Sequence, residues 1–424
     1  MRLGLDRVRR LLGAFDDPHL TTPVVLIAGT NGKGSTAALV AAMGRAAGYR
    51  VGLYTSPHLE QVTERIVLGE RPIEDRSLAG YLEEILERAG AADAAPTYFE
   101  ALTTAAFLYF HDSRAELAVM EVGLGGRLDA TNVCEPVLSL ISSIDLDHER
   151  HLGTSLAVIA GEKGGILRRG KPAIAWVEGE AADALEAQAA ALGCDLVLAP
   201  RQVRITDSPP EPGNPSPLRD LSLQTARRDY RLTLPLAGAH QRRNLGLAVL
   251  AAEALAARGW SRLDTAAIAA GSRRCRWPGR LETVTLADGR RVLLDTAHNP
   301  AAVAALCEHL RTLNESPDLL FGAMRDKNVS AMLPPIAASS RRVVLTRPRA
   351  SRAEGPPGDG PRGGDPRAWT SLVKAPVAIE TDPARALEKA LDGSSSLLVV
   401  CGSIYLVGEV RRLLRERYGA FSRR

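Results

Sequence analysis

The sequence contains few aromatic residues and few cysteines. Phe, Trp and Tyr together make up 4% of the 424 residues, so the hydrophobic cores must be built mainly from Ala, Leu and Val. The five cysteines are scattered, without the spacing that a metal site or a disulfide framework requires. They indicate reduced, buried thiols, and we therefore expect a cytoplasmic protein.

Long hydrophobic runs are also missing. No stretch reaches the ~20 apolar residues that a membrane-spanning helix needs. The N-terminal "MRLGLDRVRRLL" has the pattern of an arginine-bearing amphipathic helix, and no secretory leader is visible. The net charge of +4 is small for this length, so it suits phosphate ligands or acidic metabolites without requiring nucleic acid. We expect partners that are neither membranes nor nucleic acids.

Lysine is scarce as well. Only six of the 53 basic residues are lysines, and the rest are arginines, a bias that genomic codon usage explains. Where such a chain keeps a lysine, as at Lys33 and Lys163, the position becomes a candidate for one that arginine could not fill.

Apolar runs and helical patterns alternate along the chain. A hydrophobic content of 45% and a charged content of 24% are typical of a globular protein, and the length predicts two domains. In the first part, the apolar runs predict buried strands at residues 24–28, 51–54, 117–121, 137–142 and 172–177. Strands that alternate with helices in this way are typical of an α/β domain with a mostly parallel sheet.

A proline-rich loop and a basic linker divide the rest of the chain. "DSPPEPGNPSP", residues 207–217, fits neither a helix nor a central strand, and the alternating segment after it predicts a small antiparallel pair. A helix follows, and the junction falls near residues 273–280, "RRCRWPGR". Beyond it the alternation restarts with strands at 292–295, 318–321, 342–345 and 397–401. We therefore predict one domain over residues 1–276 and a smaller, Rossmann-like α/β domain over residues 277–424.

The stretch "TPVVLIAGTNGKGSTAALV", residues 22–40, leads from a buried strand through three glycines and a lysine into a helix. Glycines let backbone N–H groups wrap a phosphate, the helix N-terminus adds its positive dipole end, and Lys33 supplies a mobile charge. The standard pattern is not followed literally, since Ile27 stands where its first glycine belongs and Gly34 separates Lys33 from Ser35. A plain glycine-rich turn is the alternative. We favour a phosphate site, as in a P-loop-type ATPase domain, although the loop alone does not name the reaction.

Polar residues gather where the neighbouring predicted strands end. Ser56 follows the second strand, and Glu121 ends the third, beside a glycine-rich stretch. Asp145, Asp147, His148 and His151 crowd the end of the fourth. Because an open α/β sheet binds its ligands at these ends, the residues indicate a metal or phosphate site, with Glu121 placed as a Mg²⁺ ligand. Ser56 taken alone would be an ordinary turn serine.

Two further sites have roles that the sequence pattern alone does not decide. Lys163 lies on the helix before the fifth strand, where a solvated lysine paired with a nearby acid is the default interpretation. In the second predicted domain, Asp295 ends a strand, and His298 and Asn299 form the turn into a helix at Pro300. These polar residues either cap the helix or line a cleft.

Taken together, the motifs resemble one family, the bifunctional dihydrofolate synthase/folylpolyglutamate synthase branch of the Mur ligase superfamily. They occur in the family's order over nearly the whole chain: "GTNGKGS", "YTSPHL", "TYFEALT", "EVGLGGRLDATN", "DLDHERHLGTSLAVIAGEKGGI", "GAHQRRN", "WPGR", "DTAHNP", "MRDK" and "CGSIYLVGEV". The resemblance accounts for the unusual loop, because this superfamily builds its phosphate loop on Gly-Thr-Asn-Gly-Lys. It implies that ATP phosphorylates a carboxylate to an acyl phosphate, which the amine of L-glutamate attacks to give an amide, ADP and phosphate.

The resemblance also implies roles for individual positions. The implied cofactors are ATP, one or two Mg²⁺ ions, and a carbamate formed from CO₂ on Lys163. The implied ATP contacts are Thr30, Asn31, Gly32, Lys33, Gly34, Ser35, Asn244, Arg280 and Asp295. The implied Mg²⁺ ligands are Ser56, Glu121 and His148, and the implied catalytic residues are Lys163, Asp295 and His298. The implied pterin site comprises Leu3, Gly4, Leu5, Thr97, Tyr98, Phe99, Glu100, Leu128, Asp129 and Ala130.

Other interpretations make different demands on the sequence. Another Mur-type amino-acid ligase would not be expected to carry "TYFEALT" and "YTSPHL". A non-catalytic ATP-binding regulator would be expected to have lost Glu121, His148 or Lys163, and a small-molecule kinase would have no use for the second domain. We expect a cytoplasmic monomer that acts on dihydropteroate, folates and L-glutamate. One departure from the family pattern is Gly164, which should loosen its helix only slightly.

Overall fold

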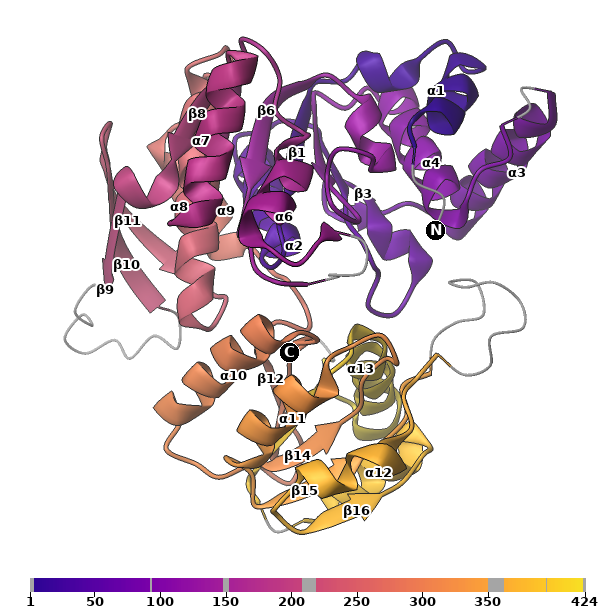
Figure 1. The fold of residues 1–424 in the computed structure, drawn as a ribbon, viewed down its shortest axis with the longest axis vertical. Coiled ribbons are helices and arrows are strands. Elements are labelled where there is room, and N and C mark those ends of the chain that lie inside the picture. Colours follow the sequence, from indigo (N-terminus) through magenta and orange to yellow (C-terminus); the bar gives the residue numbers. More distant parts are fainter. Residues whose placement is uncertain are drawn as a thin grey trace. The chain divides into compact units, whose positions relative to one another are not determined.

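The computed structural model describes residues 4–91, 94–147, 152–207, 219–349, 362–393 and 395–421 (Figure 1). Their contacts group the chain into two units. The first comprises Met1–His58, Val62–Pro235 and His240–Arg276, and the second comprises Leu59–Gln61, Leu236–Ala239 and Trp277–Arg424. The two short segments of the second unit thus pack with residues far from them in the sequence, which no local pattern indicated.

The first unit is built on an eight-stranded sheet in the order β4-β3-β2-β5-β1-β6-β7-β8. The strands from β2 to β8 in this order run parallel, and β3 and β4 add an antiparallel edge. Their bounds are β1 (Val24–Ala28), β2 (Val51–Tyr54), β3 (Ile66–Leu68), β4 (Arg71–Pro72), β5 (Leu117–Glu121), β6 (Pro136–Ile141), β7 (Pro172–Ala175) and β8 (Asp195–Leu198). The mostly parallel sheet confirms the predicted α/β class.

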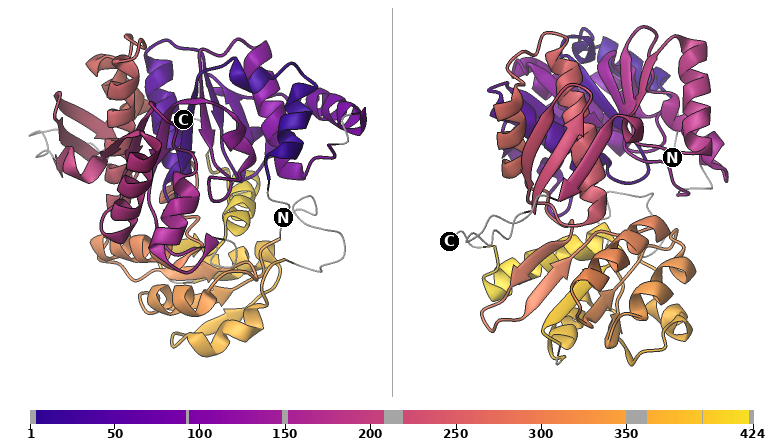
Figure 2. Two further views of the ribbon diagram at one scale, coloured as in Figure 1. Left: turned by 45° about the horizontal axis from the view of Figure 1, so that its top comes forward. Right: turned by 90° about the vertical axis from the view of Figure 1, so that its left-hand side faces the viewer.

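A small antiparallel sheet packs against α9 (Thr265–Arg274) of the same unit (Figure 2). The sequence predicted two strands here, but there are three, in the order β11-β10-β9. They are β9 (Val203–Asp207), β10 (Arg219–Thr225) and β11 (Asp229–Leu234). The helices of the unit are α1 (Asp6–Gly13), α2 (Lys33–Ala46), α3 (Asp75–Ala91), α4 (Tyr98–Asp112), α6 (Leu156–Gly164), α7 (Glu180–Leu192), α8 (Ala239–Ala256) and α9 (Thr265–Arg274).

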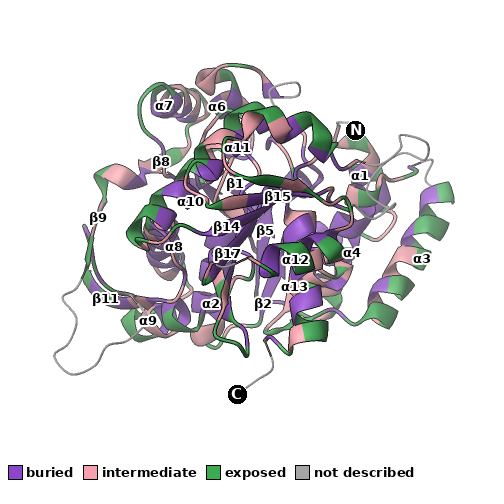
Figure 3. Cartoon of the chain, turned by 90° about the horizontal axis from the view of Figure 1, so that it is seen from below, coloured by how far each residue is buried: buried purple, intermediate pink, exposed green. Residues whose placement is uncertain are grey.

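The central strands form because they can be buried on both faces. All five residues of β1, Val-Val-Leu-Ile-Ala, are buried, as are the five of β5 (Figure 3). Such continuous apolar runs are typical of parallel strands covered by helices on both sides. Ala, Leu and Val dominate the cores, as the composition predicted, with single buried aromatic rings such as Tyr54, Phe110 and Phe321.

The second unit has a six-stranded sheet in the order β12-β13-β17-β14-β15-β16. Only β12 pairs antiparallel, and the other pairs are parallel. The strands are β12 (Glu282–Thr285), β13 (Arg291–Leu294), β14 (Asp318–Phe321), β15 (Arg342–Leu345), β16 (Val377–Ile379) and β17 (Leu397–Cys401). The helices are α10 (Pro300–Thr312), α11 (Val329–Ala337), α12 (Pro383–Leu391) and α13 (Ile404–Tyr418). This arrangement is the predicted Rossmann-like α/β fold.

All five cysteines are free thiols, and four of them are buried. Burial raises the pKa of the Cys134 and Cys275 thiols to about 12 and also raises the pKa of Cys194, Cys307 and Cys401. The thiols therefore stay protonated at neutral pH, in agreement with the sequence analysis. Of the helices in the described part of the chain, none combines the length and apolarity that crossing a membrane requires.

Candidate functional site

Four neighbouring parallel strands of the first unit bring the predicted site residues to one edge of the sheet. Strands β2, β5, β1 and β6 are adjacent and parallel, so the loops that follow them start at the same edge. The glycine-rich loop follows β1, Ser56 follows β2, Glu121 ends β5, and Asp145 comes after β6. This is the edge at which open α/β sheets bind their ligands.

The glycine-rich loop is shaped by its neighbours in the protein. Its backbone is held by the end of β6: Asn31 N–H donates to Ser143 Oγ at 3.0 Å, and Ser142 Oγ–H donates to the Asn31 carbonyl at 2.7 Å. Thr30 Oγ1 and the backbone of Asp145 are hydrogen-bonded in both directions, at 3.0 and 3.1 Å. These hydrogen bonds fix the shape of the loop.

The loop ends in a helix N-terminus suited to an anion. Gly32 is the N-cap of α2, with φ +84°, and it offers no side chain to the first N–H groups of the helix. A Cβ on Gly32 would collide with the side chain of Asn244, so glycine is required here for both conformation and space. The dipole end of this 14-residue helix has no side-chain cap and favours a phosphate.

Lys33 lies over the same loop. Its Nζ donates to the carbonyl oxygens of Gly29 and Thr30, at 3.0 and 3.1 Å. The ammonium group is therefore already held at the mouth of the loop, where it can turn to a phosphate.

Two buried amides on α8 contact the start of α2. Gln241 Nε2 donates to Ser35 Oγ at 3.3 Å, and Asn244 Nδ2 donates to Gln241 Oε1 at 2.9 Å. Asn244 was predicted from the sequence, and Gln241 was not. Gln241 lies three residues before Asn244, and residues with this spacing are neighbours on one face of a helix. This spacing was the signal that could have indicated Gln241.

Two of the three predicted metal ligands lie together. The buried carboxylate of Glu121 accepts the Ser56 N–H at 3.0 Å through Oε2. A carboxylate and a hydroxyl are the hard oxygen donors that Mg²⁺ takes, so these residues fit the ion. The third predicted ligand, His148, lies outside the described residues.

Lys163 is buried in the last turn of α6, with 3% of the residue exposed. Desolvation, helped by the charge of Lys33, lowers the pKa of its amine from 10.5 to about 7, against the opposing pull of Asp147 and Asp145. Among the residues that the structure describes, Lys163 makes no ion pair, and the adjacent Glu162 pairs with Arg127 at 2.8 Å instead. The default interpretation of Lys163 as a solvated lysine in an ion pair is therefore wrong.

The packing of α6 against α7 explains why position 164 is a glycine. A Cβ there would collide with the side chain of Gln188 on α7 and would lie 3.0 Å from Leu185. In this chain α6 and α7 thus approach closely at Gly164, and the Gln188 side chain fills the space that a methyl group would take. This packing offsets the weaker helix propensity of glycine.

Several residues of the predicted pterin site hold the local fold. Thr97 and Glu100 form a capping box at the start of α4, and Glu100 also pairs with Arg7 at 2.9 Å. The buried Asp129 accepts N–H groups of Leu124 and Thr131, at 2.9 and 3.0 Å. These bonds account for three of the predicted positions structurally, and a pterin contact at them stays a prediction.

The other predicted pterin positions differ in exposure. Tyr98 is an exposed aromatic ring with the Arg65 guanidinium 5.5 Å from its centroid, and Phe99 packs so closely on Gly123 that a Cβ there would lie 2.6 Å from the ring. Leu128 is partly exposed and Ala130 is buried. Gly4 and Leu5 precede α1, and Leu3 lies outside the described residues.

In the second unit, Asp295 holds the polar turn that follows β13 through two backbone hydrogen bonds. Its buried carboxylate accepts the N–H groups of Leu281 and Ala297, both at 2.9 Å, and burial raises its pKa against the opposing charge of Arg280. His298 Nδ1 lies 2.7 Å from the Thr296 carbonyl, which is an acceptor, so Nδ1 carries the proton.

Asn299 has the capping function that the sequence left open. Its Oδ1 accepts the N–H of Ala302 at 2.8 Å, so it caps α10. Its backbone is extended at the cap position, and Pro300 follows at the first helical residue.

The fold and the site together define a two-domain α/β protein with a nucleotide-binding unit of the P-loop type. The Mur ligase middle domain matches residues 27–252, and the Mur ligase glutamate ligase domain matches residues 279–404. The chain belongs to the Mur ligase family, in its dihydrofolate synthase/folylpolyglutamate synthase branch. The resemblance stated from the motifs is confirmed.

Known relatives cover nearly the whole chain. It is 32% identical to the dihydrofolate synthase/folylpolyglutamate synthase of Bacillus subtilis, over 97% of this chain and 95% of that protein. A probable bifunctional folylpolyglutamate synthase/dihydropteroate synthase of Haloferax volcanii is 34% identical over 96% of this chain, which spans 48% of that longer protein.

Solved structures agree with these relatives. The Escherichia coli FolC in complex with DHPP and ADP has a TM-score of 0.84 at 29% identity, covering 98% of this chain and 94% of that one. The bifunctional folylpolyglutamate synthase/dihydrofolate synthase of Yersinia pestis, complexed with AMPPNP and a Mn ion, has a TM-score of 0.80 at 28% identity, covering 98% and 94%.

Proposed function

We propose that the chain joins L-glutamate to dihydropteroate, to the γ-carboxylate of folates, or to both, in an ATP-dependent reaction through an acyl phosphate. One observation carries this proposal. A single sheet edge of the first unit bears the glycine-rich loop with Lys33 and the Glu121–Ser56 pair, and the buried Lys163 is electrostatically coupled to Lys33. The names of the relatives and the nucleotide in their solved structures support the same reaction.

The proposed roles follow the sequence analysis. Residues 1–276 hold nucleotide and pterin, and residues 277–424 act on glutamate. In the second domain Arg280 and Asp295 contact ATP, and His298 is the catalytic residue of the "DTAHNP" turn. Because Asp295 already binds the Leu281 N–H, it also fixes the backbone next to Arg280. We propose a cytoplasmic monomer with one or two Mg²⁺ ions.

The chemistry explains why this set of residues is needed. A carboxylate is a poor electrophile, so it must first accept the γ-phosphoryl group of ATP, and this transfer needs charge neutralisation and positioning more than covalent help. Lys33 and the N–H groups of α2 supply fixed positive charge at the phosphates. Mg²⁺, held by Ser56, Glu121 and His148, supplies further charge neutralisation when bound. The glutamate nitrogen then forms a bond to the activated carbonyl carbon, and phosphate leaves.

We also propose that Lys163 carries a carbamate. A carbamate forms when a neutral amine attacks CO₂ and loses a proton, so a lysine with a pKa of about 7 is suited to it at neutral pH. The product replaces a buried cation by a carboxylate-like anion, which reduces repulsion with Lys33 and offers oxygen atoms to a metal. Burial and the missing ion partner among the described residues support this assignment.

The first test is the overall reaction. Purified protein with ATP, Mg²⁺ and radiolabelled glutamate should incorporate the label only when dihydropteroate or tetrahydrofolate is present, in separate tubes, with ADP formed in step. The two acids distinguish the two activities. Turnover of ATP that gives a stable phosphorylated acid, and that does not depend on glutamate, would instead place the protein among small-molecule kinases.

A further inference from the structure

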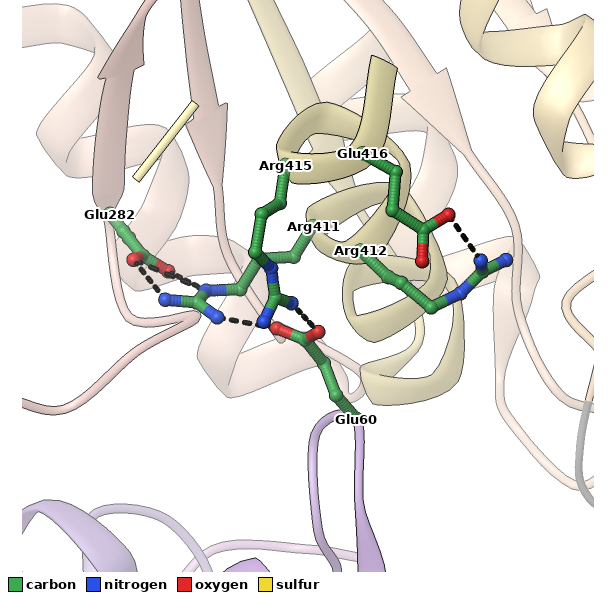
Figure 4. Close-up of polar contacts among 6 residues, drawn as sticks. All are labelled: Glu60, Glu282, Arg411, Arg412, Arg415 and Glu416. Atoms are coloured by element: carbon green, nitrogen blue, oxygen red, sulfur yellow. Dashed lines mark hydrogen bonds and ion pairs between the residues drawn. The ribbon is translucent and has the colours of Figure 1, made fainter. Parts of the chain in front are cut away.

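A buried carboxylate lies in the segment between β2 and the next helical turn. Leu59–Gln61 are grouped with the second unit, although the residues on either side belong to the first. The Glu60 side chain is only 7% exposed. Its two oxygens accept from Arg411 and Arg415, which lie one turn apart on α13 (Figure 4).

Arg411 extends this contact to Glu282, the first residue of β12. Its Nε donates to Glu282 Oε2 at 3.0 Å, and its Nη2 donates to Glu282 Oε1 at 3.1 Å. Glu282 Oε2 also accepts the N–H of Gly279 at 2.8 Å. A continuous line of charged hydrogen bonds, the Glu60 network, therefore runs from Glu60 through Arg411 and Glu282 to Gly279, the residue before Arg280.

Leu59, the residue before Glu60, packs closely against α13 and against the linker. A Cβ on Gly408 would collide with the Leu59 carbonyl oxygen, so α13 has no side chain where the segment passes. A Cβ on Gly279 would lie 3.4 Å from both Leu59 methyl carbons, so Leu59 packs directly beside the linker. A glycine weakens a helix, and its presence inside α13 indicates that the close approach of Leu59 is worth that loss.

Stability alone is a poor explanation for such a network. Burying charged groups costs desolvation energy that their mutual attraction often fails to exceed, and apolar residues would pack as well. What the network adds is a defined position. It fixes Glu60, four positions after Ser56, and it fixes the Gly279 backbone, one position before Arg280.

We propose that Glu60 is a positioning residue for the nucleotide: through Arg411 and Glu282 it fixes the segment that follows Ser56 and the linker that carries Arg280. This inference rests on the proposed roles of Ser56 and Arg280. Loss of the Glu60 charge leaves both groups less well placed, and small misplacements of binding groups lower catalysis strongly.

The test compares Glu60→Gln with a matched control on the same helix. Arg412 and Glu416 form an exposed pair at 2.6 Å, so Glu416→Gln removes a similar ion pair outside the network (Figure 4). We expect Glu60→Gln to lower kcat/KM for ATP about tenfold, mainly through KM, and Glu60→Asp to recover part of it. Glu416→Gln should leave ATP kinetics unchanged.

Two further variants separate positioning from folding. Gly408→Ala forces the Leu59 carbonyl to move without changing any charge, so it should raise KM for ATP in the same way. Combining Glu60→Gln with Arg411→Gln should lower kcat/KM by much less than the product of the single effects, because both disrupt one network. A lower melting temperature with normal ATP kinetics below it would make Glu60 merely structural and overturn the proposal.

Binding of AMPPNP, measured by calorimetry, keeps this test independent of the ligase assay. If the wild type ligates glutamate and Glu60→Gln matches the Glu416→Gln control, only the positioning role fails. If the wild type does not ligate, the proposed function fails. AMPPNP affinity then decides the role of Glu60: a tenfold weaker affinity in Glu60→Gln supports it, and an unchanged affinity overturns it.

Discussion

Glutamate ligation is expected to fall by about a thousandfold or more when Lys163 is replaced by Ala, and replacement by Arg is expected to be no better. The amine is buried and its pKa is near 7, so a large fraction is neutral at physiological pH and can react with CO₂. A guanidinium stays protonated and cannot form the carbamate. A short carboxylic acid added to the Ala variant should restore part of the turnover, because it supplies the missing oxygen atoms.

The carbamate itself can be measured directly. With ¹³C-labelled bicarbonate, the wild type should show a carbamate resonance that grows as the pH rises through about 7 and that is missing in Lys163→Arg. A high-resolution map with CO₂ available, showing a bare amine beside bound Mg²⁺ and nucleotide, would contradict the carbamate. Normal turnover in the Arg variant would remove Lys163 from the mechanism altogether.

Thermal stability provides the control for folding. Between pH 7 and 10.5 the unfolded chain binds the Lys163 proton more tightly than the folded chain, so this residue makes the free energy of unfolding rise with pH in that window. Below pH 7 the folded protein bears the full cost of a buried cation. Lys163→Met removes that cost, so without added CO₂ its melting temperature at pH 6 to 7 should equal or exceed that of the wild type while ligation is lost.

Replacing Lys33 by Met is expected to lower turnover by about a hundredfold to a thousandfold. The ammonium group is held at the loop mouth by two carbonyl oxygens, those of Gly29 and Thr30. Methionine keeps the length of the side chain but removes its charge. The appropriate control is Lys171→Met, because Lys171 is exposed and should tolerate the change.

Lys33→Met also tests whether the two lysines are coupled electrostatically. Since the charge of Lys33 helps to lower the pKa of Lys163, its removal should raise that pKa. The carbamate resonance in Lys33→Met should then appear at higher pH than in the wild type. If the pH dependence of the resonance is unchanged, the two lysines are not coupled, and if ATP turnover is also normal the loop does not act on phosphate.

Sequence periodicity predicted the central strands of both units and missed those at the edges. Strands such as β1 are continuous apolar runs and can be recognised without their partners. The edge strands β4 and β16 have two and three residues, mostly exposed, and β9 is partly exposed. Their strand conformation comes from pairing with a neighbour, and such short segments carry no distinctive pattern.

The site was predictable where it depends on strand ends and not where it depends on packing. Parallel strands must bring Ser56, Glu121 and the glycine-rich loop to one edge, and the structure has them there. Gln241 contacts a residue 206 positions away in the sequence, and Glu60 contacts one 351 positions away. No local motif reveals such contacts. Motif resemblance also does not separate a substrate contact from a scaffold residue such as Asp129, whose carboxylate is engaged within its own turn.

The state of the thiols gives this protein a practical advantage for spectroscopy. Four of its five sulfur atoms are shielded from solvent, and the raised pKa of every one keeps the reactive thiolate scarce. A cysteine introduced at an exposed helical position, for example Arg412 on α13, would therefore react with a maleimide dye well before the native ones. Dye pairs attached to the two units could then report, molecule by molecule, how the distance between them responds to nucleotide, with the native sequence otherwise intact.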